Sequence, residues 1–207
     1  MIALFASAFA TFFVVIDPPG CAPIFAGLTR DAPPRERAMM ALRATLVATG
    51  ILLFFGLLGE DLLETLGISL AAFRIAGGIM LFLIALEMVF ERRTRRRETR
   101  AQEVSEDPAH DDVSVFPMAI PMIAGPGSIA SVMLLMARSQ GLSQSLVVLA
   151  ALAAVLILTL LSLFAAGTLM RLLGHRMEAM LTRLLGVLLA ALAAQFVIDG
   201  ISVSFQV

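Results

Sequence analysis

Long apolar stretches follow one another along most of this chain, and they constrain its fold more than any other feature. They comprise Ile2 to Ile16, Cys21 to Leu28, Ala38 to Leu58, Ile68 to Phe90, Phe116 to Ala137, Ser145 to Met170 and Met177 to Ile198. A helix needs about 20 apolar residues to cross the hydrocarbon core of a bilayer. Of the 207 residues, 59% are hydrophobic and only 15% are charged, which is too little polar surface to enclose a water-soluble core. The sequence therefore predicts an all-α membrane protein whose main partner is the lipid bilayer.

The first two stretches are predicted to form one interrupted helix, which makes six transmembrane helices in total. A straight helix from Ile2 to Leu28 would be about 40 Å long at 1.5 Å per residue, whereas the bilayer core is about 30 Å thick. The run Asp17-Pro18-Pro19-Gly20 interrupts this segment. Nothing basic precedes the N-terminal stretch, so it is expected to be a retained helix rather than a signal peptide.

The basic residues predict the orientation, because short cytoplasmic loops of membrane proteins are enriched in arginine and lysine. All fifteen basic residues are arginine, and they concentrate after the first, third and fifth expected spans. The loop after the second span carries Glu60, Asp61 and Glu64, and the loop after the fourth carries only Arg138. We therefore expect both termini to lie outside the cell and the polar linker, residues 91–115, to be cytoplasmic.

Several function classes find no support in the sequence. There is no Walker-type phosphate loop, and 15 basic against 16 acidic residues provide no basic surface for nucleic acid. The single cysteine, Cys21, and the two histidines, His110 and His175, have no metal-ligand spacing. No nucleophile and base can be paired at membrane depth. We expect no nucleic-acid partner, no metal site, no enzyme activity and no cofactor other than a coupling ion, Na+ or H+.

The two halves of the chain, residues 1–90 and 116–207, resemble each other across the polar linker. Offsets of 107 to 109 residues relate Pro19-Gly20 to Pro126-Gly127, Leu66-Gly67 to Leu173-Gly174, Gly59 to Gly167 and Arg74 to Arg183. Each half has three expected spans, an odd number, so the second half must enter the membrane from the opposite side. The halves are therefore predicted to be two inverted three-helix repeats, an arrangement common among transporters.

Pro/Gly motifs break the first and the fourth helix at repeat-related positions. Pro18, Pro19 and Gly20 form one break, and Gly125-Pro126-Gly127 forms the other. In hydrocarbon, a broken helix is tolerated only where it is buried in protein or lines a cavity. We expect the two breaks to face each other at the midplane, each presenting helix N-terminal amides to an anion and free carbonyls to a cation.

Asp17 adds a carboxylate to the first break, and an ionisable residue at this depth is a functional candidate because its insertion costs about 2.5 to 3.5 kcal/mol. Amides on one side and a carboxylate on the other suit a zwitterion, so Asp17 is predicted to hold a substrate ammonium, a sodium ion or a proton. The structural alternative is that Asp17 only caps the half-helix that follows. Ser128 and Ser131 follow the second break and are candidates to donate to a substrate carboxylate, or to bond to their own helix.

Two arginines, Arg74 and Arg183, occupy matching positions early in the third span of each half. They are candidates for a gate salt bridge or a carboxylate clamp. The alternatives are snorkelling to the nearer interface or pairing with a loop acid such as Glu64. Gly77, Gly78 and Gly186 are expected to allow close helix packing, and such small-residue faces are compatible with a homo-oligomer.

The motifs together resemble the MarC family of integral membrane proteins over nearly the whole chain, apart from the arginine-rich linker. The resemblance is carried by Ile16-Asp17-Pro18-Pro19-Gly20, Phe73-Arg74-Ile75-Ala76-Gly77-Gly78, Ala124-Gly125-Pro126-Gly127-Ser128-Ile129 and Gln195-Phe196-Val197-Ile198-Asp199-Gly200. It implies a bacterial inner-membrane protein, similar in arrangement to the wider LysE superfamily of six-helix exporters, some of whose members are described as transporters of small neutral amino acids. It also implies that Asp17, Pro18, Gly20, Gly125, Pro126 and Gly127 occupy the family's motif positions.

We therefore expect a secondary transporter that moves a small neutral amino acid, such as alanine or glycine, by alternating access driven by a proton or sodium gradient. Two alternatives stay open. One is efflux of drugs or other small solutes, and the other is a membrane scaffold that transports nothing.

Overall fold

The computed structural model describes residues 1–90, 92, 99 and 112–205, of which 169–176, 178 and 179 are described by their backbone only. The described residues form helices and no strands. The helices are α1 (Ile2–Ile16), α2 (Pro18–Leu28), α3 (Pro34–Thr65), α4 (Leu70–Val89), η1 (Ser114–Ile123), α6 (Pro126–Ala137), α7 (Gly141–Phe164) and α8 (Ala166–Phe205). Most of the expected linker, residues 91–115, lies outside this description.

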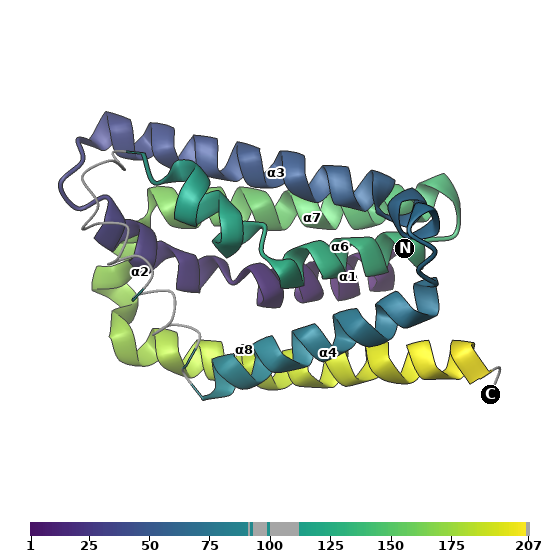
Figure 1. Cartoon of the computed structure of the whole chain (residues 1–207). Coiled ribbons are helices and arrows are strands. Elements are labelled where there is room, and N and C mark those ends of the chain that lie inside the picture. The colour runs from purple at the N-terminus through teal and green to yellow at the C-terminus, as the bar shows by residue number, and fades with distance from the viewer. Residues whose placement is uncertain (91, 93–98, 100–111, 206–207) are drawn as a thin grey trace.

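The helices form a bundle with its long axes roughly aligned (Figure 1). α3 and α7 run along one side, and α4 packs against α8 along the other, in the most extensive helix–helix contact of the bundle. The broken pairs α1–α2 and η1–α6 run between these two layers, and both chain termini lie at the same end of the bundle.

Five helical segments are long and apolar enough to cross a membrane: Ile2–Leu28, Pro34–Thr65, Leu70–Val89, Gly141–Phe164 and Met180–Phe205. The pair η1 and α6, bent by 53°, provides a sixth if it is one span. The prediction of an all-helical membrane protein is thus confirmed, with five to six candidate spans.

The connection between the last two spans differs from the prediction. The sequence placed a basic loop at residues 171–176, but the backbone turns at Ala165 and is helical from Ala166 to Phe205. No proline lies between Ala166 and Met180, and the leucine, methionine, alanine and arginine residues there favour helix. The side chains of Arg171 and Arg176 lie outside the described residues.

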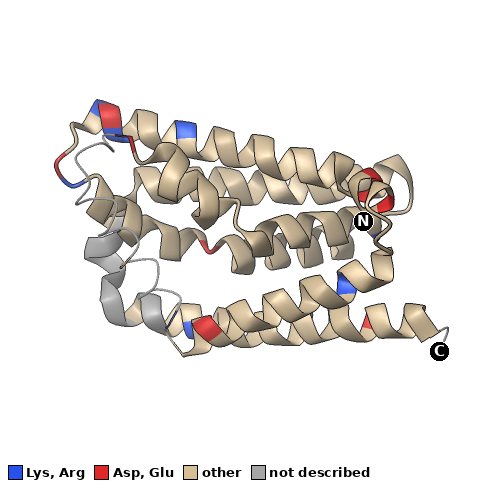
Figure 2. Ribbon diagram, in the orientation of Figure 1, with Lys and Arg blue, Asp and Glu red and all other residues tan. Residues whose placement is uncertain are grey.

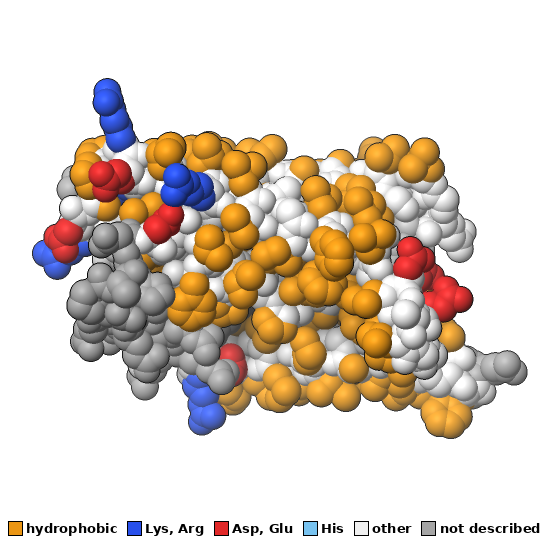
Figure 3. Space-filling model, turned by 45° about the horizontal axis from the view of Figure 1, so that its top comes forward, with side chains coloured by type: hydrophobic (Ala, Val, Ile, Leu, Met, Phe, Trp, Pro, Cys, Tyr) orange, Lys and Arg blue, Asp and Glu red, His pale blue; other side chains and the backbone are white. Residues whose placement is uncertain are grey.

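The outer surface has the charge distribution of a membrane-embedded bundle. Most charged positions lie toward the two ends (Figure 2), and the flank between the ends is largely apolar (Figure 3). Leu46, Phe54 and Leu57 of α3 are exposed by 53% to 60% on this flank, and lipid is the solvent that suits them. Glu60 and Asp61 lie near the end of α3 at which the termini are found, and Arg35 lies at its other end.

The core consists of two clusters that share residues of α1, α6 and α8. One cluster joins buried residues of α1, α2, α3, η1, α6 and α7, among them Phe12, Phe25 and Leu52, and includes Ala166 at the start of α8. The other joins residues of α1, α4, α6 and α8, among them Leu81 and Leu189. Because α1 and α6 contribute to both clusters, the broken helices occupy the centre of the bundle.

Candidate functional site

The first break is confined to a single residue, Asp17, which lies between α1 and α2. Its backbone is left-handed, with φ 59° and ψ 64°, a conformation that aspartate tolerates better than most residues. The α-helical bonds continue on either side, because Asp17 N donates to Phe13 O at 3.0 Å and Cys21 N donates to Asp17 O at 3.0 Å. α1 and α2 therefore continue as one candidate span, Ile2–Leu28, across Asp17.

The Asp17 carboxylate caps α2. Its Oδ1 accepts a hydrogen bond from Gly20 N at 3.2 Å, and Pro18 and Pro19 have no amide hydrogen to donate. The predicted set of free amides at this break is therefore wrong, because the one available donor of the first turn is already bonded to Asp17. The capping alternative is confirmed as a contact of Asp17, although a carboxylate has lone pairs for further partners.

The second break is wider and bends the chain. η1 contains two residues in extended conformation, Phe116 and Ile120, and α6 then starts at Pro126 after the N-cap residue Gly125. A Cβ at Gly125 would stand 2.4 Å from Pro121 O, so only glycine fits this close approach of the backbone.

The N-terminus of α6 differs from that of α2 because it has no side-chain cap. Pro126 has no amide hydrogen, so Gly127 and Ser128 contribute the first amides of this helix. An uncapped helix N-terminus favours an anion through its free amides and its partial positive charge. Of the two breaks, only the second begins a helix without a side-chain cap, and anion binding there stays a prediction.

The structure brings the two breaks together. A Cβ at Gly127 would stand 3.2 Å from Val15 Cγ1, two residues before Asp17, and 2.6 Å from Ile84 Cδ1 of α4. The junction of α1 with α2 and the junction of η1 with α6 accordingly lie next to each other in the middle of the bundle (Figure 1). Asp17 and Ser128 are each only 2% exposed, so the region is closed to solvent in this conformation.

Ser131 lies one helical turn beyond Gly127 and is fully buried. Its Oγ has no hydrogen-bond partner, whereas the buried hydroxyls of Thr29, Thr45 and Thr159 each donate to the carbonyl four residues earlier. A buried hydroxyl without a partner costs free energy, and the predicted hydrogen bond of Ser131 to its own helix is not formed.

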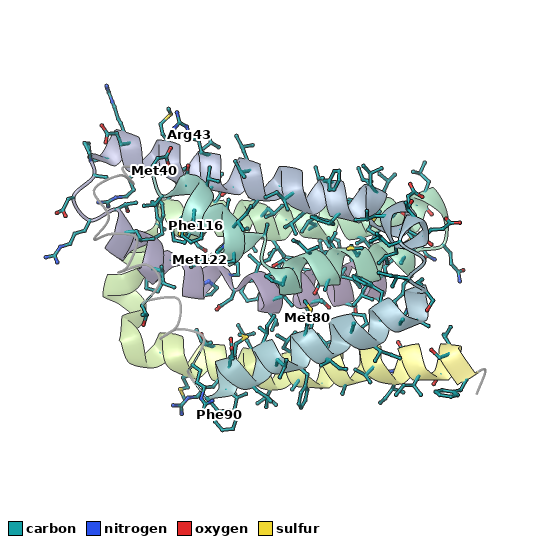
Figure 4. The ribbon with its side chains drawn as sticks, in the orientation of Figure 1. Met40, Arg43, Met80, Phe90, Phe116 and Met122 are labelled. Atoms are coloured by element: carbon teal, nitrogen blue, oxygen red, sulfur yellow. The ribbon has the colours of Figure 1, made fainter. Side chains whose placement is uncertain are left out.

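At the end of the bundle that carries Arg35, Arg43 of the first half contacts Asp112 of the linker. Arg43 Nη1 lies 2.9 Å from Asp112 Oδ2, and Asp112 Oδ1 accepts from Ser114 N at the start of η1. Figure 4 shows Arg43 on α3 near this end of the bundle. Hydrogen bonds from Ser114, opposed by burial and assisted by Arg43, lower the pKa of Asp112.

Neither predicted arginine lies at the breaks. Arg74 is half-buried near the start of α4, and Arg183 is exposed on α8. Because Gly78 contacts Ala193 while Gly186 contacts Ala85, the two helices are antiparallel and the two arginines lie at opposite ends of the pair. The two arginines therefore do not meet each other, and the role of each as a gate salt bridge or a carboxylate clamp stays a prediction.

Sequence reasoning missed a polar cluster around Arg74. We call it the acidic-end cluster because it lies toward the end of the bundle that carries Glu60 and Asp61. It contains Arg74, Arg138, Asp199, Gln195 and Phe196. Arg138 forms an ion pair with Asp199 and lies 5.2 Å from the centroid of the Phe196 ring. Arg74, Gln195, Phe196 and Asp199 lie in motifs that the sequence analysis singled out, but the sequence did not show that they meet, because the members come from three separate helical segments.

Within the described ranges, no group of three histidine, cysteine, aspartate or glutamate residues lies close enough to hold a metal ion.

Comparison with known proteins gives a consistent family assignment. Residues 2–205 match the model of the family described as MarC family integral membrane protein. A UPF0056 membrane protein of Methanocaldococcus jannaschii is 37% identical over 95% of each chain. The UPF0056 membrane protein YvbG of Bacillus subtilis is 34% identical over 96% of this chain and 94% of its own. The UPF0056 inner membrane protein YhgN of Escherichia coli K12 is 34% identical over 94% of each chain. No solved structure is significantly similar.

Proposed function

The chain belongs to the MarC family of integral membrane proteins, and from that premise we propose that it is a secondary transporter of small neutral amino acids such as alanine or glycine. The observation that carries the proposal is the meeting of two broken helices at the centre of the bundle, through Val15 and Gly127. Broken helices at membrane depth cluster at the binding sites of secondary transporters, since irregular backbone there must be enclosed by protein or line a cavity.

The chemistry of the two breaks differs in a way that suits a zwitterion. Asp17 supplies negative charge, which would attract an ammonium group. The N-terminus of α6, with the amides of Gly127 and Ser128 and no side-chain cap, would attract a carboxylate. The buried Ser131 hydroxyl, without a partner, adds a hydrogen-bonding group one turn along α6. A neutral amino acid carries both charges on adjacent carbons, so it would match both breaks at once.

The proposed site residues are Asp17, Pro18, Pro19, Gly20, Gly125, Pro126, Gly127 and Ser128. In this assignment Asp17, Gly127 and Ser128 contact the solute. The prolines and the other two glycines shape the backbone around them. A proton or a sodium ion bound at Asp17 would couple transport to an ion gradient.

The proposed mechanism is alternating access between two inverted repeats, residues 1–90 and 116–207, joined by the linker 91–115. Paired contacts between α4 and α8 support it. A Cβ at Gly78 would stand 2.8 Å from Ala193 O, and a Cβ at Gly186 would stand 3.1 Å from Ala85 O. Gly186 lies 108 residues after Gly78, and Ala193 lies 108 residues after Ala85. Each of the two contacts therefore corresponds to the other when the first half is aligned with the second.

The proposed location is the cell inner membrane, the location named for the Escherichia coli relative. Both termini would lie outside, because they share the end of the bundle that carries Glu60, Asp61 and Glu64 rather than the end with Arg30, Arg35 and Arg37.

Counterflow into proteoliposomes tests the proposal. Radiolabelled alanine or glycine should enter vesicles preloaded with the unlabelled amino acid, at a saturable rate, and an imposed proton or sodium gradient should drive accumulation. Counterflow of a radiolabelled apolar drug, without counterflow of either amino acid, would instead favour efflux of other solutes. Folded protein that exchanges neither class of solute would favour the scaffold alternative.

A further inference from the structure

The acidic-end cluster contains more positive charge than its own carboxylate neutralises. Arg138 follows the end of α6 and forms its ion pair with Asp199 of α8. Asp199 is held in place by Gln195, whose Nε2 donates to Oδ1 at 2.7 Å. Arg74 of α4 is close enough to Arg138 that the two guanidinium groups repel each other. The cluster therefore contains two neighbouring guanidinium groups and one carboxylate.

Arg74 leaves this cluster incomplete. Its Nε is buried and has no hydrogen-bond partner, although a buried guanidinium nitrogen normally donates to an acceptor. Burial lowers the pKa of Arg138, and the neighbouring charge of Arg74 lowers it further. An arginine stays protonated despite such a shift, so the repulsion persists until an anion offsets it.

The cluster is also reachable from water. The side chain of Arg138 is 37% exposed and that of Asp199 is 21% exposed, and both lie at the end of the bundle that carries the chain termini. The Phe196 ring fixes one face of the Arg138 guanidinium, which leaves its edges for Asp199 and a second anionic partner. Planar guanidinium groups bind carboxylates through two parallel hydrogen bonds.

We propose that Arg74 and Arg138 form a binding site for a small carboxylate anion at the acidic end of the bundle, with Asp199 as the internal competitor for Arg138. This site deepens the proposed transport function, because it would receive the carboxylate of the solute before or after the central site. It is separate from the two breaks, and the carboxylate can be studied by itself with acetate as the probe.

Protection from phenylglyoxal, which modifies arginine guanidinium groups, provides the test. The full-length protein in phosphatidylcholine nanodiscs is modified in sodium acetate and in sodium chloride of equal ionic strength, and each arginine is followed by peptide mass spectrometry. We expect acetate to slow the modification of Arg138 at least about threefold, while the exposed Arg30 and Arg92 react equally in both salts.

Two variants and one matched control sharpen the test. Arg74→Gln should abolish the protection of Arg138 by acetate. Asp199→Asn should lower the acetate concentration needed for half protection by several-fold, because the internal competitor is gone. Arg183→Gln changes the repeat-related arginine at the other end of the α4–α8 pair and should leave the protection unchanged.

The outcomes separate this site from the proposed function. Equal modification of Arg138 in acetate and chloride, or protection that survives Arg74→Gln, would overturn the site. Protection by phosphatidylglycerol nanodiscs without acetate, and none by acetate, would assign the arginines to a lipid phosphate and also overturn it. Protection by acetate in a protein that shows no amino-acid counterflow would support the site and contradict the transport proposal. Amino-acid counterflow without protection by acetate would contradict the site and support the transport proposal.

Discussion

The amide of Gly20 lies 3.2 Å from Oδ1 of Asp17, and a Cβ at position 20 would stand only 2.2 Å from Oδ2 of the same carboxylate. Gly20 thus donates a hydrogen bond to the Asp17 carboxylate, and its lack of a side chain avoids a steric clash with that carboxylate. This local pair places a carboxylate at the centre of the bundle, and substitution of either residue tests its role.

Asp17→Asn should abolish ion-coupled transport and leave the fold intact. Asparagine caps a helix about as well as aspartate, so the unfolding temperature should change little, whereas the negative charge is lost. Counterflow and gradient-driven uptake in proteoliposomes measure the first effect. Asp17→Ala is the companion variant and should also lose about 1 kcal/mol of stability through the missing cap. Uptake by Asp17→Asn at the wild-type rate would contradict the central role of Asp17.

Gly20→Ala should weaken the cap and impair transport, because the new methyl group displaces the Asp17 carboxylate. The expected loss of stability is about 1 kcal/mol, the usual contribution of an N-cap bond. Cys21 is the only cysteine and is fully buried, so a thiol-reactive fluorophore reports unfolding directly during a temperature ramp. Gly27→Ala, in the same helix with nothing within 4 Å of the added Cβ, is the control and should be neutral or stabilising. Equal effects of the two substitutions would argue against the steric explanation.

Gly127→Ala should destabilise the protein by about 1 to 3 kcal/mol, the usual cost of overpacking. The added methyl would meet Ile84 Cδ1 at 2.6 Å, and Ile84→Val removes that atom. The double variant Gly127→Ala/Ile84→Val should therefore recover part of the lost stability. Melting temperatures of the four proteins form a double-mutant cycle, and strictly additive effects would show that the two residues do not touch.

Gly78→Ala and Gly186→Ala should have similar effects on stability if α4 and α8 are related by an inverted repeat. Each added methyl would approach a backbone carbonyl of the partner helix, at 2.8 Å for Gly78 and 3.1 Å for Gly186, and backbone atoms do not move aside easily. Gly50→Ala on α3 meets nothing within 4 Å and is the control. Loss of stability at only one of the two positions would count against the equivalence of the halves.

Asp112→Asn should lower stability slightly at neutral pH and leave it unchanged in strong acid. Hydrogen bonds from Ser114 hold the pKa of Asp112 below its ordinary value of 3.8. A carboxylate with a lowered folded pKa stabilises the fold above its unfolded pKa, and that contribution is lost as the pH falls through the lower, folded pKa. The effect should be small, because the side chains of Arg43 and Asp112 are 58% and 44% exposed. Melting curves from pH 7 to pH 3 measure it, and a difference from wild type that grows on acidification would show the sign to be wrong.

The sequence by itself determined the class of fold and the position of both breaks. Apolar stretches of sufficient length require membrane helices, and clustered prolines and glycines favour a break in a helix, so local chemistry was enough. A single proline such as Pro23 is tolerated within α2. The helical course of residues 171–176 escaped prediction, because charge in a short segment does not by itself end a helix.

Only the tertiary structure decided which groups meet. The contact of Val15 with Gly127 and the burial of the Ser131 hydroxyl without a partner depend on helix rotation and register. Hydrophobic periodicity constrains both poorly when lipid and core are both apolar. The same reason hid the pairing of Arg138 with Asp199, residues 61 positions apart in sequence, whose interaction requires the end of α6 to lie level with Asp199 of α8.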